Sequence, residues 1–162
     1  MAFDAYMSIK GTKQGQFKGE GIQDKRKDKW IPVLSFQYSV QSPRDAASGQ
    51  ASGKRQHKPI TITKEWGPSS PLIFRALNTK EILGTVEFEF TKPGEKGEEF
   101  VFQKIRLTNA RILSYGPHVG SQPKSSHEGK RYESLTLEFQ EEFVTGGPAG
   151  QAGTIKKFGE WA

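Results

Sequence analysis

The sequence predicts a mainly β fold, a small barrel or sandwich of antiparallel strands with one short flanking α-helix at about residues 70–78. Two observations carry this prediction. Apolar and polar residues alternate along most of the chain with the period of two that is typical of half-buried strands. One segment has instead the spacing of an amphipathic helix. With 162 residues, the chain is long enough to bury a substantial core within one domain.

The first half of the chain contains three predicted strands. Odd-numbered apolar residues share one face of segment 3–9, and even-numbered ones share a face of segment 30–40. Segment 60–63 places two isoleucines on one side and two threonines on the other. Because alternate side chains of a strand point to opposite faces, we predict that the core contains Phe3, Ala5, Met7, Ile9, Trp30, Leu34, Phe36, Tyr38, Val40, Ile60 and Ile62.

The second half predicts three more strands, and the middle one changes phase. Its apolar positions are even-numbered up to Phe102 and odd-numbered from Ile105. A β-bulge near Gln103–Lys104 would explain the change, as would two buried faces at different points of a curved sheet. The flanking runs "TVEFEF" and "ESLTLEFQEEFV" alternate regularly and add to the predicted core Val86, Phe88, Phe90, Leu135, Leu137, Phe139 and Phe143.

The predicted helix follows a Gly67–Pro68 break. Ser70 is expected to be the N-cap, and Pro71 suits the first helical position, where its missing N–H costs nothing. Asn78 is the predicted end. The apolar stripe expected to pack on the barrel consists of Leu72, Ile73, Ala76 and Leu77.

Two long segments, 41–56 and 116–130, lack periodicity and are predicted to be loops. Loops of this length inside a compact domain are commonly functional or disordered. The chain is therefore divided into a barrel domain, residues 1–145, and a Gly/Pro linker with a C-terminal tail, residues 146–162. Apolar residues near the end of the tail (Ile155, Phe158 and Trp161) predict that it docks against something.

Composition limits the classes of function. The absence of Cys excludes disulfides and Cys-based zinc sites. The amino terminus lacks the basic and apolar regions of a signal peptide, and no apolar run approaches about 18 residues. We therefore expect a soluble protein made in the cytoplasm, with no membrane insertion. The net charge of +6 permits binding to nucleic acid without demonstrating it.

Tests for phosphate-loop chemistry fail. The stretch "SGKRQHK" superficially resembles a P-loop, but Ser48 stands at the first glycine position and Arg55 follows the Gly53–Lys54 pair. The segment also leads into a strand, whereas a phosphate loop leads into a helix whose N-terminus binds the phosphate. A basic loop is the better interpretation.

Other catalytic arrangements are missing as well. The three histidines (His57, His118 and His127) fall in predicted loops without a second ligand at metal-binding spacing. The acidic pairs Glu98–Glu99 and Glu141–Glu142 would point to opposite faces of a strand and cannot act as an acid–base couple. We expect no enzyme, no cofactor and no metal.

An OB-like module that binds single-stranded nucleic acid is the rival from a different class. Such modules use surface aromatics on a basic face. Most aromatics here share strand faces with Leu and Ile, which favours a place in the core. Tyr6 and Tyr115 are the exceptions, too few for a stacking platform, so we expect no nucleic-acid partner.

The order of these segments resembles the Hcp family, the tube proteins of bacterial type VI secretion systems, over about residues 3–145. The resemblance begins with "DAYMSIKG" and "IPVLSFQYSV", which are followed by a long Ser/Gly loop. Its most specific part is "HKPITITKEWGPSSPLIFRAL", a strand, a Thr-Lys step and Ser-Pro-x-Leu opening a helix. "TVEFEF", "FQKIRLTNARILSY" and "ESLTLEFQEEFV" complete it. Trp66–Gly67 departs from the family, which commonly has a polar or acidic residue there.

The resemblance implies a structural tube subunit that forms hexameric rings, which stack into a tube inside a contractile sheath below a VgrG-type spike. It also implies effector proteins carried in the lumen, and secretion through the type VI system without a signal peptide. A tail-tube or adaptor protein of another phage-like contractile injection system remains the alternative.

Stacked rings need something that protrudes along their axis, and the 41–56 loop is the candidate. We expect the basic cluster of Lys54, Arg55 and Lys58 to meet acidic groups such as Glu98 and Glu99 of the next subunit. The expected stacking residues of the loop are Pro43, Arg44, Asp45, Ser48, Gln50, Lys54 and Arg55.

Overall fold

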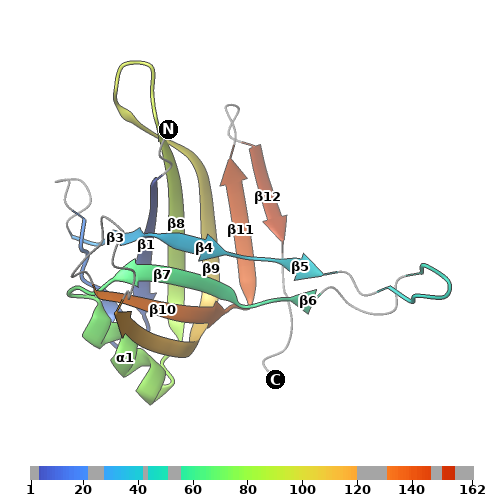
Figure 1. The fold of residues 1–162 in the computed structure, drawn as a ribbon, viewed down its shortest axis with the longest axis horizontal. Helices are drawn as coiled ribbons and strands as arrows, with labels where there is room; N and C mark the ends of the chain where they lie inside the picture. Colours follow the sequence, from blue (N-terminus) through green and yellow to red (C-terminus); the bar gives the residue numbers. More distant parts are fainter. Residues whose placement is uncertain are drawn as a thin grey trace.

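The computed structural model describes residues 4–21, 28–41, 44–50, 56–119, 131–146 and 151–155 (Figure 1). The described residues form twelve strands and one helix. These are β1 Asp4–Gly11, β2 Gly15–Gln16, β3 Ile31–Val33, β4 Ser35–Gln37, β5 Val40–Gln41, β6 Gln56–His57, β7 Ile60–Glu65, α1 Ser70–Thr79, β8 Leu83–Pro93, β9 Glu99–Val119, β10 Arg131–Glu138, β11 Glu141–Gly146 and β12 Gln151–Ile155. The mainly β prediction with one short helix is confirmed.

The main sheet is antiparallel and closes on itself. Its strand order is β2-β1-β8-β9-β10-β7-β4, and β11 adds to β9 while β12 adds to β11. The strands β3 and β4 are separated only by Leu34. Since β3 pairs with β1 and β4 pairs with β7, this continuous segment bridges the two ends of the sheet. Closure of this kind leaves fewer open edges, which would otherwise promote aggregation.

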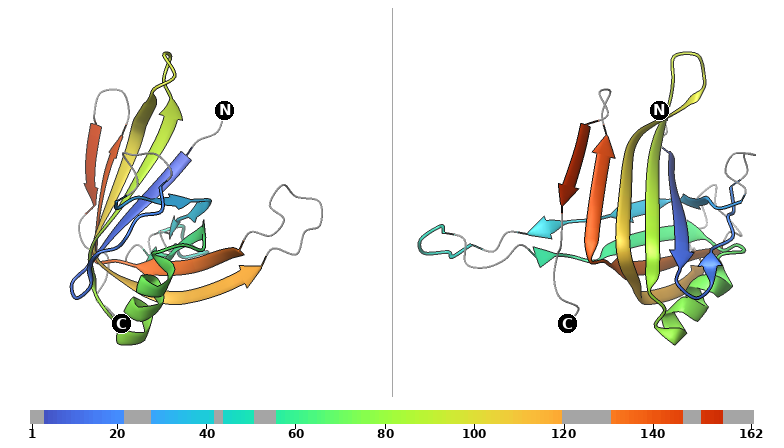
Figure 2. Two further views of the ribbon diagram at one scale, coloured as in Figure 1. Left: turned by 90° about the vertical axis from the view of Figure 1, so that its left-hand side faces the viewer. Right: turned by 180° about the vertical axis from the view of Figure 1, so that it is seen from behind.

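The long strand β9 belongs to both halves of the barrel. Its first part pairs with β8 and β11, and its second part pairs with β10. Asn109 lies at the corner between them with φ of +51°, a left-handed conformation that Asn tolerates better than most residues. The Asn109 amide donates a hydrogen bond of 3.0 Å to Gln140 Oε1, at the corner where β10 gives way to β11. Figure 2 shows the two halves diverging from this corner.

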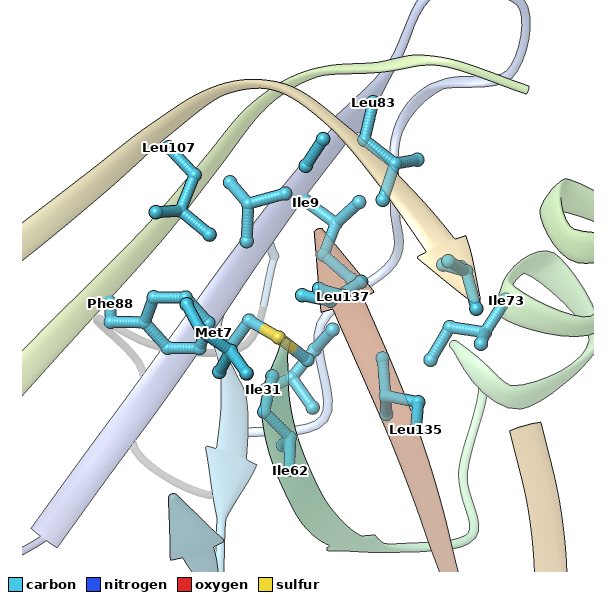
Figure 3. Close-up of a cluster of buried hydrophobic side chains, with 14 of the residues drawn as sticks. Met7, Ile9, Ile31, Ile62, Ile73, Leu83, Phe88, Leu107, Leu135 and Leu137 are labelled. Atoms are coloured by element: carbon cyan, nitrogen blue, oxygen red, sulfur yellow. The ribbon is translucent and has the colours of Figure 1, made fainter. Parts of the chain in front are cut away.

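The core lies inside this wrapped sheet. Met7, Phe88 and Leu107 of one half point toward Ile62 and Leu135 of the other (Figure 3), and all five are fully buried. Phe36 packs edge-to-face on Phe88, with ring centroids 5.0 Å apart. Further apolar side chains complete this core, and they are Ile9, Phe17, Ile31, Val33, Ile60, Ile73, Ala76, Leu83, Val86, Ile105, Ala110, Ile112, Leu137 and Phe139.

The helix α1 covers one end of the barrel, as Figure 1 shows. Ile73 and Ala76 are buried, whereas Leu72 and Leu77 are only partly buried against the core. The N-cap is Ser69 and not the predicted Ser70, and it makes no side-chain capping bond. The helix continues past Asn78 to Thr79 and ends at left-handed Lys80.

Two strand predictions fail at points where the chain begins to pair with a different strand. Leu34 is 53% exposed because the inward positions shift by one residue at the β3–β4 junction, where Ile31 and Val33 are buried instead. The run 133–144 is two strands, since the chain turns a corner at Phe139–Gln140. Phe143 is therefore not a core residue, and the guanidinium of Arg106 lies 5.2 Å from the centroid of its ring.

The predicted phase change in the long strand is confirmed. The partner of Phe90 is Gln103 and that of Thr91 is Val101, so Phe102 is the extra residue of a bulge. The predicted loop 116–130 begins too early, because Gly116–Val119 still belongs to β9.

The predicted linker and tail contains β12, which pairs with β11. The division at residue 145 stays a prediction, and Phe158 and Trp161 lie outside the described residues. Among the residues that the structure describes, no helix is long and apolar enough to cross a membrane.

Candidate functional site

The most prominent surface feature is a ribbon that leaves the barrel. The short strands β5 and β6 pair with each other, apart from the main sheet. Figure 1 shows that they extend to one side and that residues 44–50 lie farther out still. All seven of these residues are exposed. They form a loop that touches no other part of the barrel in this view and is available to a second molecule.

Hydrogen bonds around Asp45 give the tip of this loop a defined shape. Its carboxylate accepts bonds of 3.0 Å from the Ala47 N–H and of 3.0 Å from the Ser48 hydroxyl. Its main chain closes the turn through the Gly49 N–H and the Gln50 carbonyl, each at 2.8 Å. Gly49 has φ of +69°, which favours glycine. We call residues 44–50 the Asp45 turn.

The bonds to the Asp45 carboxylate favour its charged form. The Ala47 N–H contributes most and the Ser48 hydroxyl next, and together they hold the pKa of Asp45 below its usual range. The carboxylate therefore remains ionised at neutral pH. It serves as the organising group of the turn.

The structure tests the placement of only part of the predicted stacking set. Arg44, Asp45, Ser48 and Gln50 lie in the Asp45 turn and are exposed. Pro43, Lys54 and Arg55 lie outside the described residues. The acidic Glu98 and Glu99 are exposed at the β8–β9 hairpin, which protrudes in a different direction from the ribbon in Figures 1 and 2. In one copy the Asp45 turn and this hairpin lie apart, so a contact between them requires a second copy.

A buried ion cluster joins α1 to the barrel. Lys64 and Glu133 stand opposite each other on β7 and β10, and both are fully buried. The Lys64 ammonium forms an ion pair with Glu133 Oε1 and lies 3.3 Å from Glu20 Oε1. It also donates a hydrogen bond of 2.7 Å to the Glu65 carbonyl oxygen. Hydroxyls complete the cluster. The Ser70 hydroxyl donates a hydrogen bond of 2.9 Å to Glu133 Oε1, and the Tyr115 hydroxyl donates one to Glu133 Oε2.

The helix begins on this Lys64 cluster. The Ser69 N–H donates 2.9 Å to Glu20 Oε1, and the Ser69 hydroxyl bonds to the same oxygen. Two carboxylates share one ammonium, and the positive end of the helix dipole favours the excess negative charge. A Cβ on Gly67 would come within 2.4 Å of the Glu20 carboxyl carbon, so the approach requires glycine. Burial, and then the contact with Glu133, raises the pKa of Tyr115.

The sequence contained a signal for this cluster that hydrophobicity alone does not report. Lys64 continues the inward alternation of Ile60 and Ile62, and Glu133 continues that of Leu135 and Leu137. A lysine and a glutamate at inward positions of two strands predict a buried pair if the strands are neighbours. The sequence alone does not show that β7 and β10 are neighbouring strands.

A second buried carboxylate lies at the β10–β11 corner. Glu142 is buried whereas Glu141 is exposed, which confirms that this adjacent pair points to opposite faces. The Tyr38 hydroxyl donates 2.6 Å to Glu142 Oε2. Burial raises the pKa of Glu142, and the bond from Tyr38 partly offsets the rise. Burial, and then the contact with Glu142, also raises the pKa of Tyr38.

The other histidines and tyrosines singled out from the sequence lie elsewhere than predicted, where the structure describes them. His57 and His118 lie in β6 and β9 and not in loops as predicted, and His127 is outside the described residues. Tyr6 is buried and Tyr115 packs against the core, so these rings are not the surface aromatics expected from the sequence. Among the described residues, no three His, Cys, Asp or Glu side chains gather as a metal site would require.

These observations define a class of protein. Its charged clusters stabilise a closed antiparallel barrel, and its most exposed ordered feature is a polar loop on a projecting ribbon. A polar loop of this kind offers a surface for contact with another molecule.

Comparison with known proteins identifies the family. A family model described as "Type VI secretion system effector, Hcp" matches residues 6–145. The "Major exported protein" of Pseudomonas aeruginosa is 37% identical over 122 residues, which is 70% of each chain. The chain therefore belongs to the Hcp family, the tube proteins of type VI secretion systems.

Solved structures share the fold. A crystal structure of an Hcp protein has a TM-score of 0.86 and 26% identity, covering 98% of this chain and 100% of that one. Hcp1 from E. coli EAEC 042 has a TM-score of 0.83 at 23% identity, covering 96% and 99%. The secreted protein Hcp3 from Pseudomonas aeruginosa has a TM-score of 0.76 at 23% identity, covering 98% and 100%. The last two similarities support the fold alone.

Proposed function

We propose that this chain closes into a hexameric ring and that rings stack through the Asp45 turn to form the tube of a type VI secretion system. In this proposal it is a structural component that performs no chemistry, and the tube is expelled with effector proteins in its lumen. The observation that carries the stacking role is the preorganised, exposed Asp45 turn on a ribbon that projects from the barrel.

Physical arguments support a ring. A closed ring of identical subunits needs two different surfaces of each copy that complement one another. Stacking of one ring on the next also needs two unlike surfaces, and the projecting ribbon and the β8–β9 hairpin provide them, one with basic residues in its loop and one with Glu98 and Glu99. Opposite charges on them would favour the correct orientation of stacking and disfavour the reverse.

The defined turn also lowers the entropic cost of stacking. A loop whose shape is already fixed by Asp45 has less conformational freedom to lose on contact than an unstructured one. Stacking contacts in this proposal are made by Pro43, Arg44, Asp45, Ser48, Gln50, Lys54 and Arg55, with Glu98 and Glu99 as counterparts.

The remaining partners and the route follow from the family. We place a contractile sheath around the tube and a VgrG-type spike above it. The protein leaves the cell through the secretion system. Another phage-like contractile injection machine would use the same barrel and ring, and its sheath and spike would then be the partners.

Deleting residues 45–53 tests the stacking role. The variant is expected to fold and to form rings of unchanged sedimentation coefficient, but to make no tubes under conditions where the parent chain does. The deletion removes the Asp45 turn while leaving β5, β6 and the barrel intact. Tube formation at the parental level by this variant would refute the stacking role.

A further inference from the structure

An apolar groove with Trp66 at its centre lies beside the start of α1. On one side of the Trp66 indole ring is a hollow of about 500 Å³ whose lining includes Pro32, Leu34 and Pro68. On the other side is a hollow of about 670 Å³ lined by Pro71, Phe74, Tyr115 and Pro117 among others. We call the two hollows together the Trp66 groove. Three of the five large apolar side chains that are exposed among the described residues lie in it, namely Leu34, Trp66 and Phe74.

The walls of this groove are fixed in place. The Trp66 indole N–H donates 2.8 Å to the Tyr132 carbonyl, and the guanidinium of Arg131 lies 5.3 Å from the ring centroid. Phe74 packs against Tyr115 with ring centroids 6.0 Å apart, and the Tyr115 hydroxyl is held by the Lys64 cluster. An occupant would meet rigid aromatic surfaces, which reduces the entropy lost on binding.

The charges around the groove are unevenly distributed. Glu20 and Glu65 line the smaller hollow. The guanidinium of Arg131 lies over the ring of Trp66, a residue that lines both hollows. A complementary segment would carry cations at one end, an apolar side chain for each hollow, and an anion near Trp66.

One segment of this chain has that pattern. Residues 156–162 read "KKFGEWA" and lie outside the described residues. Lys156 and Lys157 match the acidic side of the groove, Phe158 and Trp161 supply one aromatic side chain for each hollow, and Glu160 matches Arg131. Aromatic side chains buried in fixed pockets are typical anchors of protein interfaces.

The placement of β12 indicates which copy supplies the segment. Figures 1 and 2 show β12 at the outer side of β11, on the opposite side of the barrel from α1 and the end of β7 that leads to Trp66. The segment has only seven residues, which extend over roughly 25 Å at most. We propose that residues 156–162 of a neighbouring copy occupy the Trp66 groove. This inference rests on the proposed assembly of several copies.

Disulfide trapping tests the inference, because the chain has no Cys of its own. A chain with both Pro117→Cys and Ala162→Cys places one thiol at the groove and one beside the last aromatic anchor. On oxidation it should form covalent dimers and higher multimers. The matched control pairs Leu113→Cys with Ala162→Cys, since Leu113 is exposed on the same strand but lines neither hollow. Docking should raise the trapping rate at least about tenfold over the control, through effective concentration.

A charge exchange tests the predicted orientation of the segment. Adding Glu65→Lys to the trapping pair should slow cross-linking, and adding Lys156→Glu and Lys157→Glu to that variant should restore it. A cross-link confined to single chains would overturn the neighbouring-copy assignment. A rate equal to that of the Leu113 control, or no rescue, would overturn the docking itself.

Sedimentation of the reduced trapping variant separates this inference from the proposed function. Rings without selective cross-linking contradict the docking alone. Failure to form any ring contradicts the proposed assembly, and the docking with it.

Discussion

The Lys64 cluster and the Asp45 turn are both organised by carboxylates that accept several hydrogen bonds, but they differ in burial. Glu133 is fully buried and shares its cation with Glu20, whereas Asp45 is exposed and is bonded only within its own loop. An unpaired charge is costly where water is excluded and nearly costless where water remains. The first region therefore stabilises the subunit, and the second is available for contact between subunits.

Removing the cation of the Lys64 cluster is expected to have the largest effect. Lys64→Met leaves the buried Glu133 and the partly buried Glu20 without their cation, and breaking a buried pair in this way typically costs about 3–5 kcal/mol. Urea unfolding followed by tryptophan fluorescence measures the change. Lys104→Met is the control, because Lys104 is 58% exposed and lies 3.6 Å from Glu89. Equal losses for the two variants would contradict the distinction between buried and exposed charges.

Truncating the buried face of α1 should have the next largest effect. Ile73 is fully buried, so Ile73→Ala should lower the unfolding free energy by about 2–5 kcal/mol. Leu72→Ala, on the partly buried neighbour, should cost clearly less. Chemical denaturation of both variants gives the comparison. A larger loss for Leu72→Ala would show that the helix is rotated relative to the barrel.

A smaller, pH-dependent effect is expected at Glu142. Since burial raises its folded-state pKa, the protonated form is favoured by folding. The stabilising contribution is fully present below the unfolded pKa, about 4.3, and is lost as pH rises through the folded pKa. Glu142→Gln keeps an acceptor for Tyr38 without the charge, so its stability relative to the parent should increase from pH 4 to pH 7.

Unfolding free energies measured at both pH values check this prediction. The matched control is Glu141→Gln on the exposed neighbour, which should match the parent within error at both values. If the stability of Glu142→Gln relative to the parent falls from pH 4 to pH 7, the pKa of Glu142 is not raised by folding.

Asp45→Ala should have the smallest effect on the subunit and a clear effect on assembly. The melting temperature is expected to stay within error of the parent, because the hydrogen bonds of Asp45 among the described residues all lie within the turn. Tube formation should weaken, since the contact surface loses its defined shape. Light scattering at equal protein concentration measures this, with Ala47→Ser as a control that keeps the turn. A clearly lower melting temperature would show instead that Asp45 contributes to the stability of the subunit.

The regions also differ in how far the sequence could predict them. Alternation correctly placed Met7, Ile60 and Leu135 in the core, because a half-buried strand must repeat every two residues. It failed at Leu34 and at Gln140, where the chain changes its pairing partner and the inward phase with it. Partner changes depend on the whole topology, so local patterns cannot report them.

The candidate sites show the same limit. The position of the 41–56 loop between strands was predicted, but the turn around Asp45 depends on side-chain bonds that only coordinates reveal. The Lys64 cluster was missed because its pair is separated by 69 residues. The Trp66 groove combines β7, α1 and β9, so its residues are adjacent only after folding.

Negative-stain electron microscopy of the purified full chain tests the central claim most directly. The account predicts six-fold rings with an open centre, together with stacks of rings at high protein concentration. A population of single barrels, or of closed dimers that never form rings, at the same high protein concentration would contradict it.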